Sequence, residues 1–238
     1  MNYEYWRQHG VYFASDEQKI KDFLTNQYPN FNLEQVLSEL EQAAAARQFE
    51  WDRVQIQVTT RGNLHIQHHF DPGNHDEEPL SLRRILMVPS DNGRRASHEE
   101  MILPESMQRK GLSRYLIRPY YNQYKVSGVD FIDAYAGANG GGYALARYGF
   151  DAVNQGDIIK ILIRAQTLGI DSEALNILAE DVKRFYESNP HSAPFRIHEW
   201  SQTPFGEKLL AGTYWKAVLD LHNSDQLDIF EEYLDSEP

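Results

Sequence analysis

The chain has 238 residues, of which 41% are hydrophobic, 12% aromatic and 24% charged. This composition is close to the globular average and excludes wholesale disorder. Asp and Glu total 35 against 23 Lys and Arg, and the net charge of −12 disfavours binding to nucleic acid or to an anionic membrane surface. There is no cysteine, which excludes disulfides, thiolate metal sites and a cysteine nucleophile.

No apolar run approaches the ~20 residues that span a bilayer. The first residues do not join a basic end to an apolar run, so we expect no signal peptide and a cytoplasmic protein. Export by a signal-independent route would leave the same sequence.

Positive charge is concentrated in the middle of the chain. Residues 52–125 carry 11 basic and 9 acidic side chains, whereas residues 1–51 carry 4 and 8, and residues 126–238 carry 8 and 18. An anionic ligand is therefore expected on the middle segment.

Residues 1–51 predict a helical extension. Ser15 or Asp16 can cap a first helix, and Asn32 can cap a second whose apolar residues recur at helical spacing, at Val36, Leu37, Leu40 and Ala44.

From residue 52 the pattern alternates with a period of two, which is typical of strands. Residues 54–58 and 64–70 predict a hairpin around the turn at residues 60–63, and residues 80–88 and 96–103 predict a third and a fourth strand. These strands are expected to form an antiparallel sheet.

The remaining elements are mainly helical. A helix follows residue 112 and is expected to kink or end at Pro119. The further predicted elements are short strands at 129–132 and 150–153 and helices at 143–148, 157–168 and 171–186. Residues 188–215 receive no assignment, and the acidic last 19 residues predict a solvated helix or a frayed tail.

The segment between the fourth strand and the next helix has the residues of a pyrophosphate cradle. A helix start offers unpaired N–H groups and a positive dipole end, and Gly111 lets the backbone approach a ligand closely. Arg109 and Lys110 add positive charge, and Ser113 can donate a hydroxyl hydrogen bond.

This segment, Gln108-Arg109-Lys110-Gly111-Leu112-Ser113, resembles the acyl-CoA-binding motif Q/R-x-x-G-x-G/A of the GNAT superfamily of N-acyltransferases, with Ser in the last place. Met101-Ile102-Leu103-Pro104 resembles the end of that superfamily's fourth strand, residues 129–136 its fifth, and Tyr148-Gly149-Phe150 its frequent Gly-Phe helix end. The resemblance covers roughly residues 52–153.

The resemblance implies an α+β fold with a mixed, largely antiparallel sheet splayed between its fourth and fifth strands. Residues 1–51 and 154–238 would be helical extensions around a core at 52–153. Acyl-CoA would lie in the gap, its pyrophosphate on the amides of Arg109, Lys110, Gly111 and Ser113 and its pantetheine arm along Met101, Ile102 and Leu103.

The same resemblance implies direct transfer of an acyl group to an amine, with a base on the fourth strand and a tyrosine as acid. Glu99 and Glu100 are the candidate bases, and strand alternation predicts that they point to opposite faces. Leu145 occupies the family's usual tyrosine position, so Tyr143 and Tyr148 are the nearby candidates.

Each candidate also has a structural interpretation. Glu99 and Glu100 can pair across strands with Arg83 or Arg84, which we favour over catalysis. Tyr143 and Tyr148 can pack in a core, Gln108–Ser113 can be a solvated loop, and Gly140–Gly142 can be a flexible helix entry. Strand alternation explains the histidines near residues 65–75, so no metal site is expected.

The leading hypothesis is therefore an N-acyltransferase that uses acetyl-CoA, or another acyl-CoA, as co-substrate. Its acceptor would be a cationic amine, either a small molecule or a protein lysine, because the surface is acidic. The alternative is a GNAT-like protein with lost or altered chemistry that binds a partner protein through its terminal helices. The absence of cysteine and of a G-x-S-x-G motif disfavours a hydrolase.

Overall fold

A computed structural model describes residues 1–47, 50–71, 80–108, 110–137 and 140–236. The chain falls into two compact units, Met1–Ile132 with Tyr233–Pro238, and Asp133–Glu232. These limits differ from the expected segment boundaries at residues 51 and 153, and the three-part division stays a prediction.

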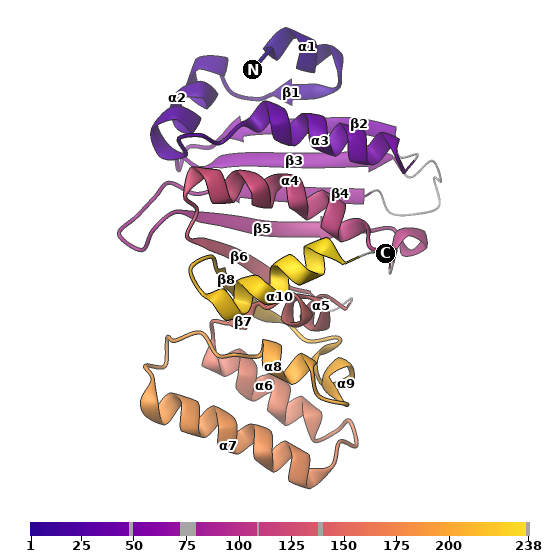
Figure 1. The fold of residues 1–238 in the computed structure, drawn as a ribbon, viewed down its shortest axis with the longest axis vertical. Helices are drawn as coiled ribbons and strands as arrows, with labels where there is room; N and C mark the ends of the chain where they lie inside the picture. Colours follow the sequence, from indigo (N-terminus) through magenta and orange to yellow (C-terminus); the bar gives the residue numbers. More distant parts are fainter. Residues whose placement is uncertain (48–49, 72–79, 109, 138–139, 237–238) are drawn as a thin grey trace. The chain divides into compact units, whose positions relative to one another are not determined.

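The first unit contains strands and helices in an α+β arrangement (Figure 1). Its elements are α1 (Tyr3–Gln8), β1 (Val11–Phe13), α2 (Glu17–Gln27), α3 (Leu33–Ala45), β2 (Glu50–Val58), β3 (Leu64–Asp71), β4 (Leu80–Leu86), β5 (Arg95–Ile102), the 3₁₀ turn η1 (Glu105–Met107), α4 (Leu112–Ser127) and the first residues of β6 (Phe131–Ala136). The expected α+β class with a mixed sheet is confirmed at this level.

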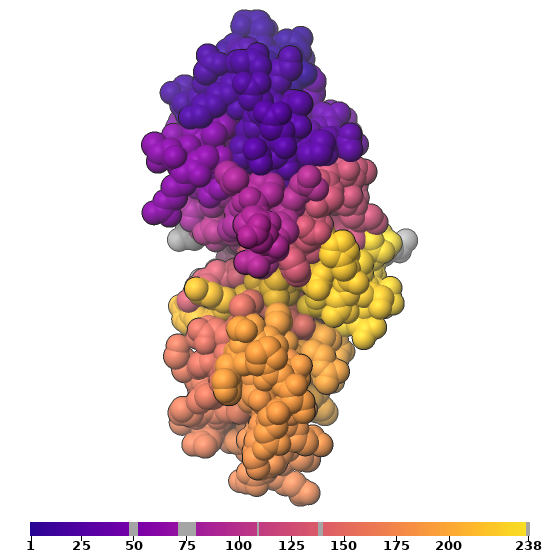
Figure 2. All heavy atoms as spheres, turned by 90° about the vertical axis from the view of Figure 1, so that its left-hand side faces the viewer, coloured from indigo at the N-terminus to yellow at the C-terminus, as the bar shows by residue number. Residues whose placement is uncertain are grey.

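The sheet of the first unit has the strand order β1-β2-β3-β4-β5. Strands β2 to β5 pair antiparallel, as their alternation predicts. β1 pairs parallel with β2, so the N-terminal segment contributes a strand that its sequence did not indicate. In Figure 2 the indigo residues of this segment form one end of the unit.

The helix starts in this segment follow from capping. The side chains of Asp16 and Asn32 accept hydrogen bonds from the backbone N–H groups of Gln18 and Gln35 at the starts of α2 and α3. Each satisfies one of the N–H groups that a helix start leaves unpaired.

Cross-strand pairing sorts the side chains of β2 to β5 onto two faces. On one face, mainly apolar side chains are buried beneath α3 and α4, which lie in front of the strands in Figure 1. On the other face, which we call the polar face, three rows run across the strands: Arg53–His69–Ser81–Ile102, Gln55–Gln67–Arg83–Glu100, and Gln57–His65–Ile85–Ser97.

The face beneath α4 also buries a polar cluster. Arg84 is 1% exposed, and its Nη1 donates to the carbonyl oxygens of Glu100 at 2.7 Å and Arg83 at 3.1 Å. His68 Nε2 lies 2.5 Å from the Tyr120 hydroxyl, and His98 Nε2 lies 3.2 Å from that of Tyr124. Both tyrosines belong to α4, so hydrogen bonds tie this helix to the sheet.

The second unit carries strands in the order β6-β8-β7 together with helices. Its elements are the rest of β6, α5 (Gly141–Arg147), β7 (Asp151–Ala152), α6 (Gln155–Ala165), α7 (Ser172–Ser188), α8 (His198–Ser201), α9 (Gly206–Leu210), β8 (Trp215–Asp220) and most of α10 (Ser224–Asp235). Helices α8 and α9 lie in residues 188–215, which the sequence left unassigned, and strand β8 begins at the last of these residues.

Two features of the packing in the second unit explain particular residues: a close backbone approach at Gly142 and a buried hydrogen bond between Asp151 and His198. A Cβ added to Gly142 would lie 2.4 Å from the carbonyl oxygen of Leu210, which explains a glycine here without any phosphate. Buried Asp151 accepts a hydrogen bond from Nδ1 of buried His198 at 2.7 Å.

Candidate functional site

Strand β5 contains a β-bulge at Glu99. Arg83 is opposite Glu100 and Arg84 is opposite His98, so Glu99 is an extra residue without a partner on β4. Arg84 donates to the carbonyl oxygens of residues beside this irregularity, which accounts for a buried guanidinium in the core.

The bulge corrects the expectation that Glu99 and Glu100 point to opposite faces. Glu99 accepts a hydrogen bond from Ser97 Oγ at 2.6 Å, and Glu100 accepts one from Ser81 Oγ at 2.6 Å. Ser97 and Ser81 both lie on the polar face. The extra residue shifts the alternation by one, and the structure therefore brings both carboxylates to the same face.

The expected cross-strand ion pairs are also wrong. Among the described residues, neither Glu99 nor Glu100 has an ion pair with Arg83 or Arg84. Arg84 lies on the opposite face and bonds to backbone oxygens, whereas Arg83 is directly opposite Glu100 without pairing with it.

One imidazole on the polar face has a lowered pKa. His65 on β3 lies on the polar face, and its pKa is lowered first by burial and then by the positive charge of Arg83, while Glu99 acts in the opposite direction. His65 is therefore neutral at pH 7.

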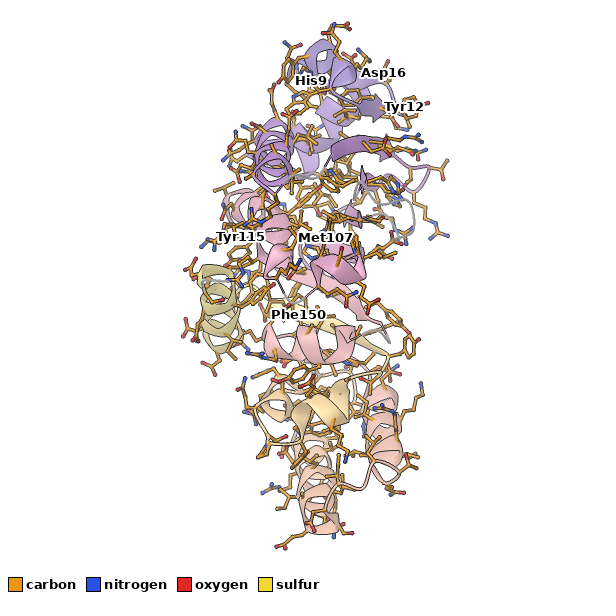
Figure 3. The ribbon with its side chains drawn as sticks, turned by 90° about the vertical axis from the view of Figure 1, so that its right-hand side faces the viewer. His9, Tyr12, Asp16, Met107, Tyr115 and Phe150 are labelled. Atoms are coloured by element: carbon orange, nitrogen blue, oxygen red, sulfur yellow. The ribbon has the colours of Figure 1, made fainter. Side chains whose placement is uncertain are left out.

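The chain leaves β5 through η1 and enters α4 at Gly111. Gly111 has φ +68°, a left-handed conformation that favours glycine, and it occupies the N-cap position without a capping side chain. Figure 3 labels Met107 before this turn and Tyr115 after it. The start of α4 thus keeps the uncapped N–H groups expected of an anion site.

The predicted cradle residues differ in their surroundings. Lys110 is exposed, and Arg109 lies outside the described residues. The Gln108 side chain donates to the carbonyl oxygen of Leu103 at 2.9 Å, which fixes the connection between β5 and η1. Leu112 is buried in the core and so helps to fix the start of the helix.

Arg114 is a cation at this turn that the sequence motif does not include. It is 8% exposed, and its Nε donates to the carbonyl oxygen of Gly111 at 3.1 Å. A Cβ on Gly111 would lie 2.4 Å from Arg114 Nη2, so the guanidinium occupies the space that glycine leaves. The clue in the sequence was its position three residues after the glycine, one helical turn away.

The C-terminal turn of α10 packs against the same end of α4. The hydroxyl of Ser113 lies 2.5 Å from that of Tyr233, and Arg114 Nη1 donates to Ser236 Oγ at 3.2 Å. Arg118 donates to the Asp235 carboxylate at 2.9 Å. The Ser113 hydroxyl, expected to contact phosphate, therefore already has a partner from the chain itself.

The expected pantetheine edge lies at the end of β5. Met101 pairs with Leu82 and Ile102 with Ser81 on β4, and Ile102 is 38% exposed. At the other end of the strand, the backbone N–H groups of Asp130 and Phe131 donate to the carbonyl oxygen of Arg94. The start of β6, the expected fifth strand, is thus hydrogen-bonded to the residue before β5, the expected fourth strand. The expected separation of these two strands farther along stays a prediction.

The candidate acids belong to the second unit. Tyr143 and Tyr148 are both partly exposed, and the Arg147 guanidinium carbon lies 5.8 Å from the centre of the Tyr143 ring. Leu145 is in the same helix, α5. The catalytic assignment of the two tyrosines stays a prediction.

Within the described part of the chain, no cluster of three or more His, Cys, Asp or Glu side chains is arranged to hold a metal ion. His75 and Asp76 lie outside those residues. No helix among those described combines the length and apolar character that a membrane crossing requires.

Comparisons with known proteins supply no family for this chain. No protein-family model, curated protein or solved structure matches it. Functional inference therefore depends on the chain's own residues and on the resemblance of its central motif.

Proposed function

We propose that the protein is an acyl-CoA-dependent N-acyltransferase. The observation that carries the proposal is the turn at Gly111, where an uncapped helix start with a buried Arg114 follows, after η1, a bulged strand that bears two carboxylates. N–H groups at a helix start together with a guanidinium suit a diphosphate.

The reaction would join the acceptor nitrogen to the thioester carbonyl carbon and break the bond from that carbon to sulfur. An ammonium acceptor and acyl-CoA would give an amide, the CoA thiol and one released proton. The base removes a proton from the acceptor, and a second proton from the nitrogen ends on the thiolate.

We assign the base to Glu100. Its carboxylate is partly buried and held by Ser81, whereas Glu99 is exposed and held by Ser97 within its own strand. A partly buried carboxylate interacts with an ammonium group more strongly than an exposed one, because water screens it less.

The first test measures CoA binding by thermal unfolding. A ligand at about 100 times its Kd stabilises the folded state by ~2.7 kcal/mol, which corresponds to a rise in Tm of about 5 to 10 °C for a chain of this size. Gly111→Glu should abolish the rise, because it adds bulk and negative charge at the anion site.

Gly169→Glu is the matched control for this test. Gly169 also has a positive φ, of +61°, and an added Cβ would meet no atom within 4 Å. The control should keep the CoA-dependent rise in Tm. An absent rise in the wild-type protein, or an equal rise in Gly111→Glu, would contradict the proposed CoA site.

Turnover is measured separately by release of the CoA thiol. The chain has no cysteine, so a thiol reagent detects CoA without background from the protein. With a panel of amines and acetyl-CoA, Glu100→Gln should lower kcat by about 10²- to 10⁴-fold, the usual contribution of a general base. Glu99→Gln should change it little, and the reverse result would transfer the role to Glu99.

A partner-binding module is the second candidate, and one observation favours it. Ile159 and Ile163, one helical turn apart on α6, and Ile177 on α7 are 44%, 59% and 61% exposed, so these helices present apolar side chains that a partner could cover. A protein that neither binds CoA nor releases its thiol would make this the better proposal.

A further inference from the structure

The polar face presents two opposite charges side by side without joining them. Arg83 and Glu100 are direct cross-strand partners in the row Gln55–Gln67–Arg83–Glu100. Directly opposed side chains on antiparallel strands have Cβ atoms about 4.5–5.5 Å apart, which is close enough for an ion pair. No such pair forms among the described residues.

The Glu100 carboxylate has a different partner, whereas the Arg83 guanidinium has none among the described residues. The Glu100 carboxylate is held by the Ser81 hydroxyl at 2.6 Å, on the next cross-strand row. The Arg83 guanidinium makes no hydrogen bond or ion pair with the described residues, and its Nε is buried without a partner. Its Nη1 and Nη2 groups also donate no hydrogen bond to the described residues, so this partly exposed side chain keeps donors for a ligand that accepts hydrogen bonds.

The chemistry of the two groups defines what fits between them. A guanidinium binds a carboxylate through two parallel hydrogen bonds, and a carboxylate binds an ammonium group. The row is partly exposed, so a solute can reach it, and its two glutamine side chains add neutral donors and acceptors beside the charges.

We infer that the acceptor is a free amino acid or a closely similar zwitterion. Its carboxylate binds Arg83, and its amino group faces Glu100, the base of the proposed reaction. This inference rests on the proposed function and narrows its substrate class: Arg83 selects amines that carry a neighbouring carboxylate.

The test measures binding directly, so that it does not depend on turnover. Saturation-transfer NMR is recorded with a pool of the common L-amino acids and, separately, with glycine, leucine and phenylalanine against the amines that lack their carboxylate. We expect transfer to at least one amino acid and at least tenfold weaker binding of the matched amine.

Arg83→Gln should weaken amino-acid binding by about 10- to 100-fold, the usual effect of removing a charged hydrogen-bonding partner. Arg83→Lys should also weaken it, because lysine keeps the charge but not the planar fork. Arg53→Gln is the matched control: it removes an exposed arginine from the same face, one row away, and should leave binding unchanged.

Several results would overturn the inference: no transfer to any amino acid, equal binding of amino acids and matched amines, or unchanged binding in Arg83→Gln. The CoA-dependent rise in Tm is measured on the same samples. A protein that binds CoA but shows no amino-acid preference refutes only this inference, whereas one without a CoA response refutes the proposed function.

Discussion

In the buried polar cluster beneath α4, burial keeps two histidines neutral. Burial is the largest cause that lowers the pKa of both histidines. It lowers the pKa of His68 to about 3 and that of His98 well below its usual value. The positive charge of Arg84 lowers both further. Both imidazoles are therefore neutral in the folded protein, whereas in the unfolded chain they titrate near about 6.5.

This difference predicts a loss of stability in acid. As the pH falls below about 6.5, His68 and His98 bind protons in the unfolded chain but stay neutral in the folded protein. The free energy of unfolding therefore decreases towards pH 3. Each histidine contributes a slope of up to ~1.4 kcal/mol per pH unit. Urea unfolding between pH 7 and pH 4.5 measures the slope, and His98→Gln should reduce it.

The exposed His191 supplies the control for this experiment. His191→Gln should leave the pH slope unchanged. An equal slope in wild type and His98→Gln would mean that carboxylates elsewhere cause the acid sensitivity.

At the scale of elements, the contact between α4 and the C-terminal turn combines two kinds of interaction. The hydroxyls of Ser113 and Tyr233 meet in a largely buried position, with Ser113 8% exposed. Arg118 and Asp235 form an ion pair whose side chains are 40% and 71% exposed. Water screens the second interaction and scarcely reaches the first.

We therefore expect the two to differ in their effect on stability. Tyr233→Phe should lower the free energy of unfolding by about 1 kcal/mol, because it leaves the Ser113 hydroxyl without that partner. Asp235→Asn should lower it by less than about 0.5 kcal/mol, as is usual for an exposed ion pair. Urea unfolding of the two variants at one pH checks the order, and a larger effect of Asp235→Asn would contradict it.

The sequence predicted those elements whose signals are local. Alternation predicted β2 to β5, and Asp16 and Asn32 capped the helices that begin beside them. It missed β1, because three residues show no periodicity and the strand exists through its parallel partner. It also missed β8, which begins at the last residue of the stretch rich in Pro, Gly and Trp.

The candidate site divides in the same way. The helix start after Gly111 could be predicted because local signals decide it. The position of Glu100 could not, because it depends on an extra residue in β5 that shows only in the pairing with β4. Arg84 and Arg114 could not either, since tertiary contacts bury their charge.

At the scale of the whole molecule, the excess of acidic residues controls solubility. The net charge is −12 at pH 7, and the sequence pI is about 5.2. Mutual repulsion keeps molecules apart at neutral pH and disappears as the pH approaches the pI. The acid destabilisation from His68 and His98 falls in the same pH interval.

We therefore expect precipitation near pH 5. Light scattering of a dilute solution should rise sharply between pH 6 and pH 5, because loss of net charge and partial unfolding act together. Glu→Gln substitutions at exposed sites, such as Glu4 and Glu180, should move the onset to higher pH. An onset that is independent of these substitutions would show that unfolding alone controls it.

The bulge at Glu99 has a consequence for how this protein can vary between generations. Loss of the single codon for Glu99 would leave His98 opposite Arg84 and Glu100 opposite Arg83, so β5 would pair regularly with β4 and every following side chain would keep its face. Strand β5 can therefore absorb one in-frame deletion. A second deletion would find no extra residue left and would turn the following side chains over.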